Sequence, residues 1–400
     1  MINSVQGLIY EPTAAPCDIV MDSNNIYTVN ATTLFRKYDQ ATLTNTLTVN
    51  ATSSTAATGV ALMNSASAVV SCTSANLLFI ELSTGHRSTI TTNAAATQRS
   101  TAMQQIATNQ STLFGIATKS TTGSVTLING STFALSSLSI AGLTSQNATC
   151  VIAKTDSSNF FIGTTDSKVY EIDTSGTVIK SLTLPVTNRY GGALTSLQVG
   201  SMAYYNNYLL VADTGGIVRL YDWTGGPTLL DQYFCTAWNL NQTIMLSNAA
   251  SGTCYMTTPQ ANNLYNHAIH EVYFEKGEIL VESCWTGVFN STTLIGTAQN
   301  TSGKMAMITT GTTSPCAMRV FNVTSPVKVN VLTRAQDPVS LDVPARVIRI
   351  RDAGIGRTFC ESDITIAAGA SSYPCTADRN YIELALLTSP NKYDIREFKS

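Results

Sequence analysis

The chain has 400 residues, enough for two or three average domains or for one large all-β domain with an appendage. Charged residues make up only 12% of the chain, 23 Lys and Arg against 25 Asp and Glu, and the formal net charge is -2. So few cations cannot form the basic stripe that neutralises nucleic-acid phosphates. We therefore expect no nucleic-acid partner.

The polar residues are mostly Ser, Thr and Asn, and the good surface helix formers Lys and Glu are scarce. Thr and Val restrict χ1, and Ser and Asn compete for backbone hydrogen bonds, so this composition favours strands and turns over helices. No run of about 18 apolar residues occurs, and the N-terminal segment lacks the basic and apolar regions of a secretory signal. We expect neither membrane insertion nor a Sec leader.

A five-residue pattern recurs along the chain, with apolar residues at its first and fourth positions and Asp, Glu or Asn at its end. Its copies are 35–39, 77–81, 125–129, 169–173, 218–222 and 318–322. Successive closing residues are 42, 48, 44, 49 and then 100 residues apart, so one copy is missing from the last interval. Residues 277–290 are the predicted place of that hidden copy.

A repeat of 40 to 50 residues is typical of propeller blades. Residues 160–184 and 208–233 are the clearest copies, each with three strands and two Asp- and Gly-containing turns, the sequence of an antiparallel meander. The prediction is an all-β chain with a β-propeller over residues 1–333, of seven blades, or of six if 277–322 forms a single blade. The closing acids Asp173 and Asp222 are expected to accept backbone N–H groups of the following turn.

The segments YLLVAD and GIVRLYD, residues 208–213 and 216–222, resemble blades of the broad quinoprotein, NHL and YVTN propellers. The repeated Trp-Asp and Gly-His of WD40 proteins and the repeated double glycine of kelch proteins do not occur. The resemblance covers about 300 residues and implies the architecture alone.

Residues 234–270 are long for a connection between strands and contain aromatic residues, which predicts an elaborated loop over one face of the ring. Exposed aromatic side chains bind sugars or protein partners, so Trp238, Tyr255 and Tyr265 are the predicted partner-binding residues of this face. Trp223 and Trp285 are instead expected to fill the gaps between blades.

The blade pattern stops near residue 333, and residues 334–400 predict a small β-rich module. Within it, residues 344–369 give two strands around a Gly-containing loop, and further strands follow in NYIELALLT and YDIREF. The first segment is similar to the closing strands of discoidin-like or fucolectin-like modules, which implies sugar recognition; an ordinary β-hairpin is the alternative. The module has a high local density of arginine, and we expect contacts to partner carboxylates or backbone from Arg346, Arg349, Arg351 and Arg357.

Few residues are suited to catalysis or metal binding. His267 and His270 could share a metal on a helical turn, but the surrounding sequence predicts a strand, which would point them to opposite faces. No G-x-S-x-G elbow or cofactor loop occurs, so no cofactor and no enzymatic activity are expected. The nine cysteines include no C-x-x-C pair; Cys235 with Cys254 and Cys360 with Cys375 are spaced for disulfides, but buried thiols are favoured.

The Thr-, Ser- and Asn-rich, charge-poor sequence resembles structural proteins of virus particles, especially tailed-phage tails, fibres and capsid ornaments. This resemblance implies a non-enzymatic virion protein whose exposed propeller mediates assembly or host-surface attachment. Its partners would be other virion proteins and a host-surface glycan or receptor. A secreted or surface lectin-like module, with a processed leader and oxidised cysteines, is the alternative. A propeller-fold polysaccharide lyase or glycosidase, with a charged central pocket, is a second.

Overall fold

The computed structural model describes twenty segments of the chain. They are 2–11, 16–30, 35–50, 57–72, 76–91, 106–118, 124–143, 148–186, 193, 197–234, 244–249, 252–259, 267–285, 293–299, 304–310, 316–323, 333–334, 347–352, 357–361 and 381–385, with residue 193 a single bridge position and some strand side chains undescribed.

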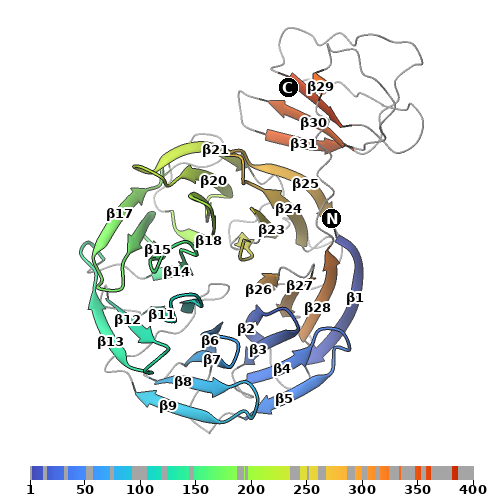
Figure 1. The fold of residues 1–400 in the computed structure, drawn as a ribbon. Helices are drawn as coiled ribbons and strands as arrows, with labels where there is room; N and C mark the ends of the chain where they lie inside the picture. The colour runs from blue at the N-terminus through green and yellow to red at the C-terminus, as the bar shows by residue number, and fades with distance from the viewer. Residues whose placement is uncertain are drawn as a thin grey trace.

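The described strands before residue 324 form seven four-stranded antiparallel sheets, arranged as blades around a ring (Figure 1). Blade one is β2 (Pro16–Met21), β3 (Asn25–Asn30), β4 (Phe35–Asp39) and β5 (Asn45–Val49). Blade two is β6 (Ala57–Leu62), β7 (Ser67–Cys72), β8 (Asn76–Glu81) and β9 (Arg87–Thr91). Blade three is β10 (Ile106–Asn109), β11 (Phe114–Thr118), β12 (Ser124–Asn129) and β13 (Leu135–Ser139).

The next blades continue the same meander, from the first strand at the centre to the fourth at the rim. Blade four is β14 (Ala148–Ala153), β15 (Phe160–Thr164), β16 (Lys168–Ile172) and β17 (Val178–Thr183). Blade five is β18 (Val199–Tyr205), β19 (Tyr208–Asp213), β20 (Ile217–Asp222) and β21 (Thr228–Phe234). Blade six is β22 (Met245–Leu246), β23 (Thr253–Pro259), β24 (His267–Tyr273) and β25 (Leu280–Trp285).

Blade seven joins the two ends of the ring. Its inner strands are β26 (Thr293–Gln299), β27 (Lys304–Thr310) and β28 (Cys316–Val323), and its rim strand is β1 (Ile2–Glu11) from the start of the chain. β1 pairs antiparallel with β28, with Leu8 opposite Arg319 and Tyr10 opposite Ala317. Backbone hydrogen bonds between distant parts of the sequence therefore close the circle.

Strand burial follows position within a blade. β17 at the rim alternates between half-buried and exposed residues, whereas β15, inside the same blade, is buried at every position. An inner strand packs against a neighbouring blade on both faces, so both of its side-chain sets must be apolar or small. A rim strand meets solvent on one face and alternates.

The closing residue of the five-residue pattern stabilises the turn that follows it, as predicted. Asp173 Oδ1 accepts hydrogen bonds from the backbone N–H groups of Ser175 (2.8 Å) and Thr177 (2.9 Å). The Ser175 hydroxyl contributes most to holding the pKa of Asp173 below its usual value. Closing residues of three other blades accept turn N–H groups in the same way: Asp39, Asn129 and Asp222.

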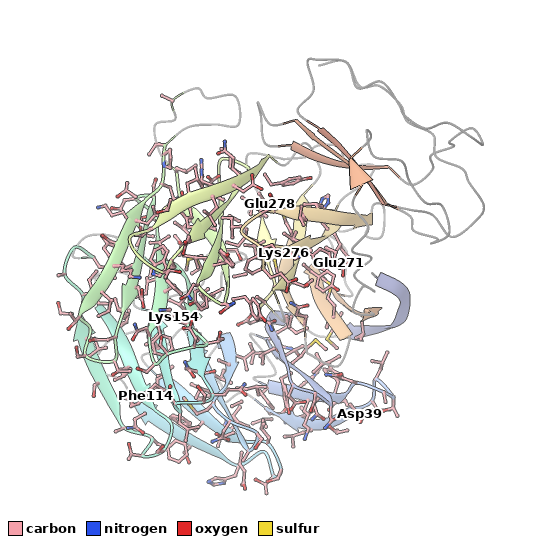
Figure 2. The ribbon with its side chains drawn as sticks, turned by 45° about the horizontal axis from the view of Figure 1, so that its top comes forward. Asp39, Phe114, Lys154, Glu271, Lys276 and Glu278 are labelled. Atoms are coloured by element: carbon pink, nitrogen blue, oxygen red, sulfur yellow. The ribbon has the colours of Figure 1, made fainter. Side chains whose placement is uncertain are left out.

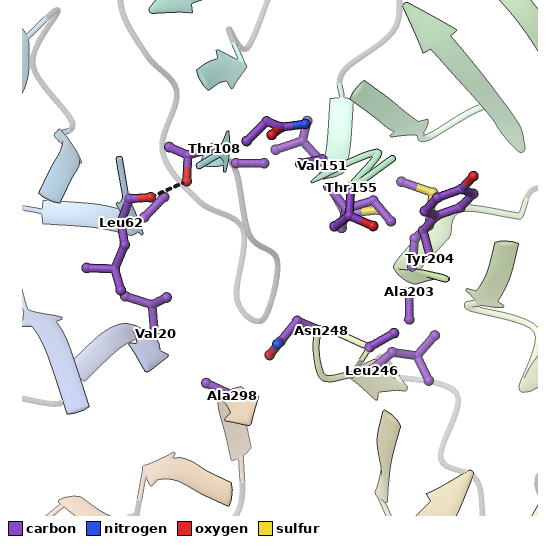
Figure 3. Close-up of a pocket in the computed structure, with 18 of the residues that line it drawn as sticks. Val20, Leu62, Thr108, Val151, Thr155, Ala203, Tyr204, Leu246, Asn248 and Ala298 are labelled. Atoms are coloured by element: carbon purple, nitrogen blue, oxygen red, sulfur yellow. Dashed lines mark hydrogen bonds between the residues drawn. The ribbon is translucent and has the colours of Figure 1, made fainter. Parts of the chain in front are cut away.

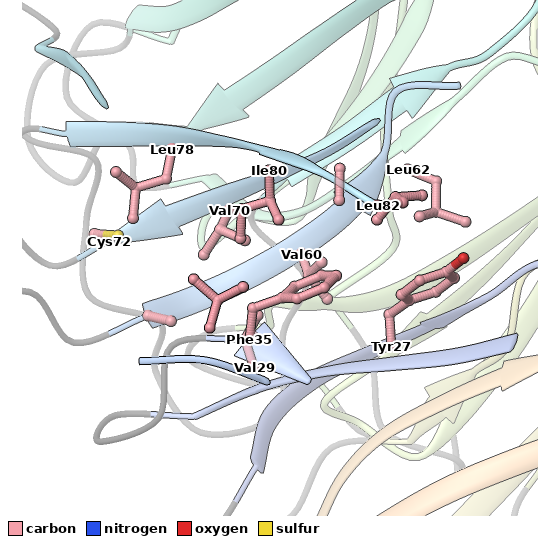
Figure 4. Close-up of a cluster of buried hydrophobic side chains, with 13 residues drawn as sticks. Tyr27, Val29, Phe35, Val60, Leu62, Val70, Cys72, Leu78, Ile80 and Leu82 are labelled. Atoms are coloured by element: carbon pink, nitrogen blue, oxygen red, sulfur yellow. The ribbon is translucent and has the colours of Figure 1, made fainter. Parts of the chain in front are cut away.

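The core is a series of apolar clusters, each between two consecutive blades. Between blades one and two, Phe35 packs among Val29, Val60 and Ile80 (Figure 4). Comparable clusters join blades two and three, three and four, four and five, and five and six, and another joins blade seven to blade one. The described apolar side chains are therefore buried between blades, and a blade shares its core with a blade beside it.

Polar bonds near the axis also join successive blades, between residues one repeat apart. The pairs lie 42 to 50 residues apart: Asp18 Oδ2 with Val60 N (3.0 Å), Thr108 Oγ1 with Leu62 O (2.6 Å), Thr149 Oγ1 with Val199 O (2.6 Å) and Ser201 Oγ with Leu246 N (2.9 Å). Each satisfies a backbone group at the crowded centre of the ring, where an unpaired one would be costly.

A separate four-stranded sheet follows the ring in sequence. It consists of β29 (Thr333–Arg334), β32 (Tyr381–Ala385), β30 (Val347–Asp352) and β31 (Arg357–Glu361), in that order. β30 and β31 form the antiparallel pair predicted for 344–369, and β32 lies within the predicted strand NYIELALLT. β31 lies beside β25 at the rim of the ring (Figure 1). Residues 393–398, the last predicted strand, are outside the described residues.

The prediction of an all-β propeller with a β-rich C-terminal module is confirmed. Two details were wrong. The predicted loop 234–270 contains β22 and β23 and the start of β24, so much of it is the inner part of blade six. The hidden copy of the pattern is not in 277–290, where β25 forms the rim, because the equivalent third strand is β24. Within the described residues, no helix is long and apolar enough to cross a membrane.

Deletion of residues 2–11 tests the closure. It removes the partner of β28 and leaves a row of unpaired backbone groups at the seam. We expect the midpoint of thermal unfolding to fall by about 5 °C or more. The control is deletion of residues 391–400, which removes the same number of residues from the other end of the chain. This deletion should change the midpoint little. An unchanged midpoint without residues 2–11 would show that the seam does not hold the ring.

Candidate functional site

A cavity of about 410 Å³ lies at the centre of the ring, where the first strands of the blades face one another (Figure 3). All seven blades contribute to its lining, through β2, β6, β10, β14, β18 and β26 and through residues at and after β22. The volume lies within the range of small-molecule sites, ~300–1,000 Å³. The cavity is therefore the candidate functional site.

Most side chains in the wall of the cavity are small or branched and apolar. Examples from six blades are Val20, Val60, Ala107, Val151, Ala203 and Ala298. Seven strands converge on the axis, so only compact side chains leave space between them. The open centre is thus a consequence of the small residues on the first strands.

Polar side chains collect at the turns that follow the first strands. Gln110 and Ser111 lie in the β10–β11 turn, Thr155 in the β14–β15 turn and Asn248 after β22, and all four are exposed and line the cavity. Carboxamides and hydroxyls both donate and accept hydrogen bonds. The cavity therefore has an apolar wall and a polar mouth.

The described lining residues include no Asp, Glu, Lys, Arg or His. Cys150 is the one thiol among them, and burial raises its pKa to about 12, so at neutral pH it is a thiol and a poor nucleophile. Burial also raises the pKa of Tyr204 above its usual range. This lining is suited to binding neutral groups, and it offers no acid–base pair of ordinary pKa.

A buried carboxylate stabilises one side of the mouth. Glu171 in β16 is 1% exposed and accepts hydrogen bonds from Asn159 Nδ2 (2.7 Å) and Trp223 Nε1 (2.6 Å). Lys154 Nζ completes the site 3.2 Å from Glu171 Oε1. Burial pushes the pKa of Glu171 upward, but the donors from Asn159 and Trp223 and the Lys154 charge outweigh it, and the pKa lies below its usual value.

The same contacts fix the turn that carries Thr155. Lys154, before it, is bound to Glu171, and Asp156, after it, accepts a 2.5 Å hydrogen bond from the Tyr204 hydroxyl of blade five. Figure 2 shows Lys154 in its place on the ring. Both charged neighbours of Thr155 are therefore held by protein groups, and the turn is attached to the next blade.

The predicted partner-binding residues do not come together in the described structure. Tyr255 is 2% exposed in β23 and donates a hydrogen bond to Glu271 Oε1 (3.3 Å), so its prediction as a surface residue was wrong. It lies on an inner blade strand, where both faces pack against neighbours. Trp238 and Tyr265 lie outside the described residues.

The predicted arginines belong to the C-terminal sheet. Arg349 and Arg351 are in β30 and Arg357 is in β31, and their backbones pair with neighbouring strands; Arg346 lies outside the described residues. Trp223 is fully buried and fills the gap between blades four and five, as predicted, with its ring 5.2 Å from that of Phe161.

The histidine and cysteine predictions have clear outcomes where residues are described. His267 and His270 lie on strand β24, not on a helix, as expected, and burial lowers the pKa of His270 to about 4. Cys254 is a buried free thiol, so it forms no disulfide with Cys235. Cys72 and Cys150 are also buried free thiols, the state that the sequence favoured.

Sequence reasoning missed the cavity and the Glu171 cluster. The sequence signal for the cavity was the polar turn after the first strand of each blade. The five-residue pattern describes the third strand and does not include that turn. Glu171 lies among Val169, Tyr170 and Ile172 in its strand, and an acid there can be recognised as buried only once the neighbouring blade, with Trp223, is placed against it.

No known protein family matches the sequence, and no curated protein matches it. The fold is similar to a chain in the crystal structure of a mitotic checkpoint complex, with a TM-score of 0.60 and 10% sequence identity, over 80% of this chain and 96% of that one. That neighbour is a WD40-type propeller. At this identity the likeness shows a β-propeller fold and nothing of the function.

The substitution Glu171→Gln tests the cluster. One carboxylate oxygen becomes an NH₂ group that faces other donors, so the unfolding free energy should fall by about 1–3 kcal/mol at pH 7. Chemical denaturation measures this change. Glu81→Gln is the matched control, because Glu81 is exposed on the third strand of blade two and the amide oxygen of Gln can still accept its hydrogen bond from Thr84, so the loss of stability should be well below that of Glu171→Gln.

The pH dependence of the same variant gives an independent check. Because the folded pKa of Glu171 lies below the ordinary value of 4.5, its contribution is fully present above pH 4.5 and is lost as the pH falls through the folded pKa. The stability difference between the two proteins should therefore shrink below pH 4.5. A difference that stays constant down to pH 3 would contradict the ionised state of Glu171.

Proposed function

We propose that this chain is a non-enzymatic structural protein of a virus particle, in which an exposed propeller mediates assembly or attachment to a host surface. The proposal unites the virion-like composition of the sequence with a binding cavity at the centre of the ring. The single observation that carries it is the neutral character of that cavity and of the turns around it. Such a surface favours binding over acid–base chemistry.

The exposed rim supports the same proposal. β13 at the rim of blade three reads LSSLS, with no charged residue, and its serines are exposed. A surface of hydroxyl groups with little charge has little long-range electrostatic field, so salt changes its contacts only weakly. This property suits a particle that must stay assembled in different ionic surroundings.

The two alternatives draw less support from the described residues. A secreted lectin-like module would be expected to contain oxidised cysteines, whereas Cys72, Cys150 and Cys254 are free thiols. A lyase or glycosidase requires acids or bases at its centre, and the described lining offers neutral groups. The lyase or glycosidase alternative also predicts cleavage of a saccharide, which the proposed function does not.

In this proposal the C-terminal sheet anchors the chain to other virion proteins. Arg349, Arg351 and Arg357 lie on the paired strands β30 and β31, and an arginine can bind a carboxylate through two parallel hydrogen bonds. Together with Arg346 they would bind acidic or backbone groups of a neighbouring protein. The ring would then present its cavity away from the anchor.

Deletion of residues 334–400 tests the anchor. The described ring strands end at Val323, so the truncated chain should keep the melting profile of the ring but fail to enter particles. Incorporation is measured by mass spectrometry of purified particles from cells that make either form. Replacement of the four arginines by glutamine should also reduce incorporation. Replacement of the same arginines by lysine is the charge-matched control.

Normal incorporation of the truncated chain would refute the anchor. Absence of the full-length chain from every purified particle would refute the proposed function itself. Loss of folding on truncation would show that the C-terminal residues stabilise the ring. The incorporation of the arginine variants would then be the test of whether the C-terminal sheet is the anchor.

A further inference from the structure

The mouth of the central cavity has hydrogen-bonding groups that the fold leaves available. Asn248 is engaged, because its side chain bonds the backbone of Gln299 from both ends. Ser111 Oγ likewise donates to Asn109 Oδ1 at 2.7 Å. Gln110 and Thr155 are exposed and have no bonded side-chain partner within the described residues. These two side chains can therefore bond a ligand without breaking a protein contact.

The charged side chains on either side of Thr155 already have partners in the protein, and the Asp156 carboxylate stays 41% exposed. Lys154 is bound to Glu171, and Asp156 accepts from Tyr204. A charged ligand that entered the apolar cavity would lose its hydration and meet no charged side chain among the described lining residues, which disfavours its binding. A neutral ligand carries no such cost.

The wall and the mouth together match an amphipathic ligand. Val20, Val60 and Val151 offer a surface for C–H groups, and the carboxamide and hydroxyl groups of Gln110 and Thr155 both donate and accept. A ligand with one C–H face and several hydroxyl groups satisfies both zones. Saccharides have this chemistry, and neutral ones avoid the cost of desolvating a charge.

We propose that the central cavity binds a neutral saccharide at the mouth formed by Gln110 and Thr155. The biological meaning of the site rests on the proposed attachment function, in which the saccharide belongs to a host-surface glycan. The binding itself depends only on the ring. The inference therefore assigns a ligand class to the cavity and a direct role to two residues.

The test uses saturation-transfer NMR and titration calorimetry on the full chain. The soluble probes are the methyl glycosides of glucose, galactose, mannose and N-acetylglucosamine, with N-acetylneuraminic acid as the charged comparison. Oligosaccharides with the same terminal residues, immobilised on a surface, separate binding of a free sugar from binding of a glycan end. We expect saturable binding of at least one neutral probe and binding of the charged sugar at least tenfold weaker.

Substitution locates the site. The double variant Gln110→Ala, Thr155→Ala removes two hydrogen-bonding side chains. It should lower the affinity for the neutral sugar about tenfold or more. Thr183→Ala and Ser136→Ala are matched controls, because both residues are exposed on rim strands away from the cavity, and they should leave affinity unchanged. Both side chains of the double variant are exposed, so its melting temperature should equal that of the parent chain.

Three outcomes would overturn the inference: no saturable binding of any neutral probe, equal affinity in the double variant, or tighter binding of N-acetylneuraminic acid than of every neutral sugar. If the double variant melts at a lower temperature, the sugar affinity of Gln110→Glu is measured instead. Its new carboxylate at the mouth should weaken sugar binding while the ring stays folded, and an unchanged affinity would overturn the inference. Incorporation into particles is a separate readout, so a cavity without saccharide affinity in a chain that still enters particles refutes this inference alone.

Discussion

Every blade of this ring depends on its neighbours, because no single four-stranded sheet buries its own apolar faces. The apolar clusters lie between blades, and the polar bonds near the axis connect residues about one repeat apart. The pairing of β1 with β28 closes this ring, and we expect the closure to stabilise the interfaces between the blades. Strands from the two ends of the ring sequence therefore form one blade.

The closed ring also determines the nature of the central site. Seven first strands converge on one axis, and their small side chains leave a cavity with an apolar wall. The turns after these strands then supply the groups at its mouth. In blades four and five, the bonds of Glu171 and Tyr204 hold the turn 154–159, and Glu171 pairs with the Lys154 charge, so Thr155 presents its hydroxyl group between two side chains that already have partners.

The repeat could be predicted from the sequence because the third strands of several blades end in an acid or amide that accepts N–H groups of the following turn, as Asp173 does. Blade six was missed because its third strand, β24, reads HAIHEVY and does not end in an acid or amide. Tyr255 was interpreted as a loop residue because its partner strand had not been recognised. The cavity could not be predicted, since Gln110 and Thr155 are ordinary turn residues until the ring brings them to one opening. Glu171 likewise gains its role only from Trp223, 52 residues away.

The central claim is that the neutral cavity of the closed ring is a ligand site. The most direct measurement is a crystal structure of the full chain grown with the neutral sugar that binds best in solution. The account predicts a sugar at the mouth, with its hydroxyl groups within hydrogen-bonding distance of Gln110 and Thr155 and its C–H face against the apolar wall. An empty cavity with the sugar bound elsewhere on the chain, or a cavity filled by the protein's own side chains, would contradict it.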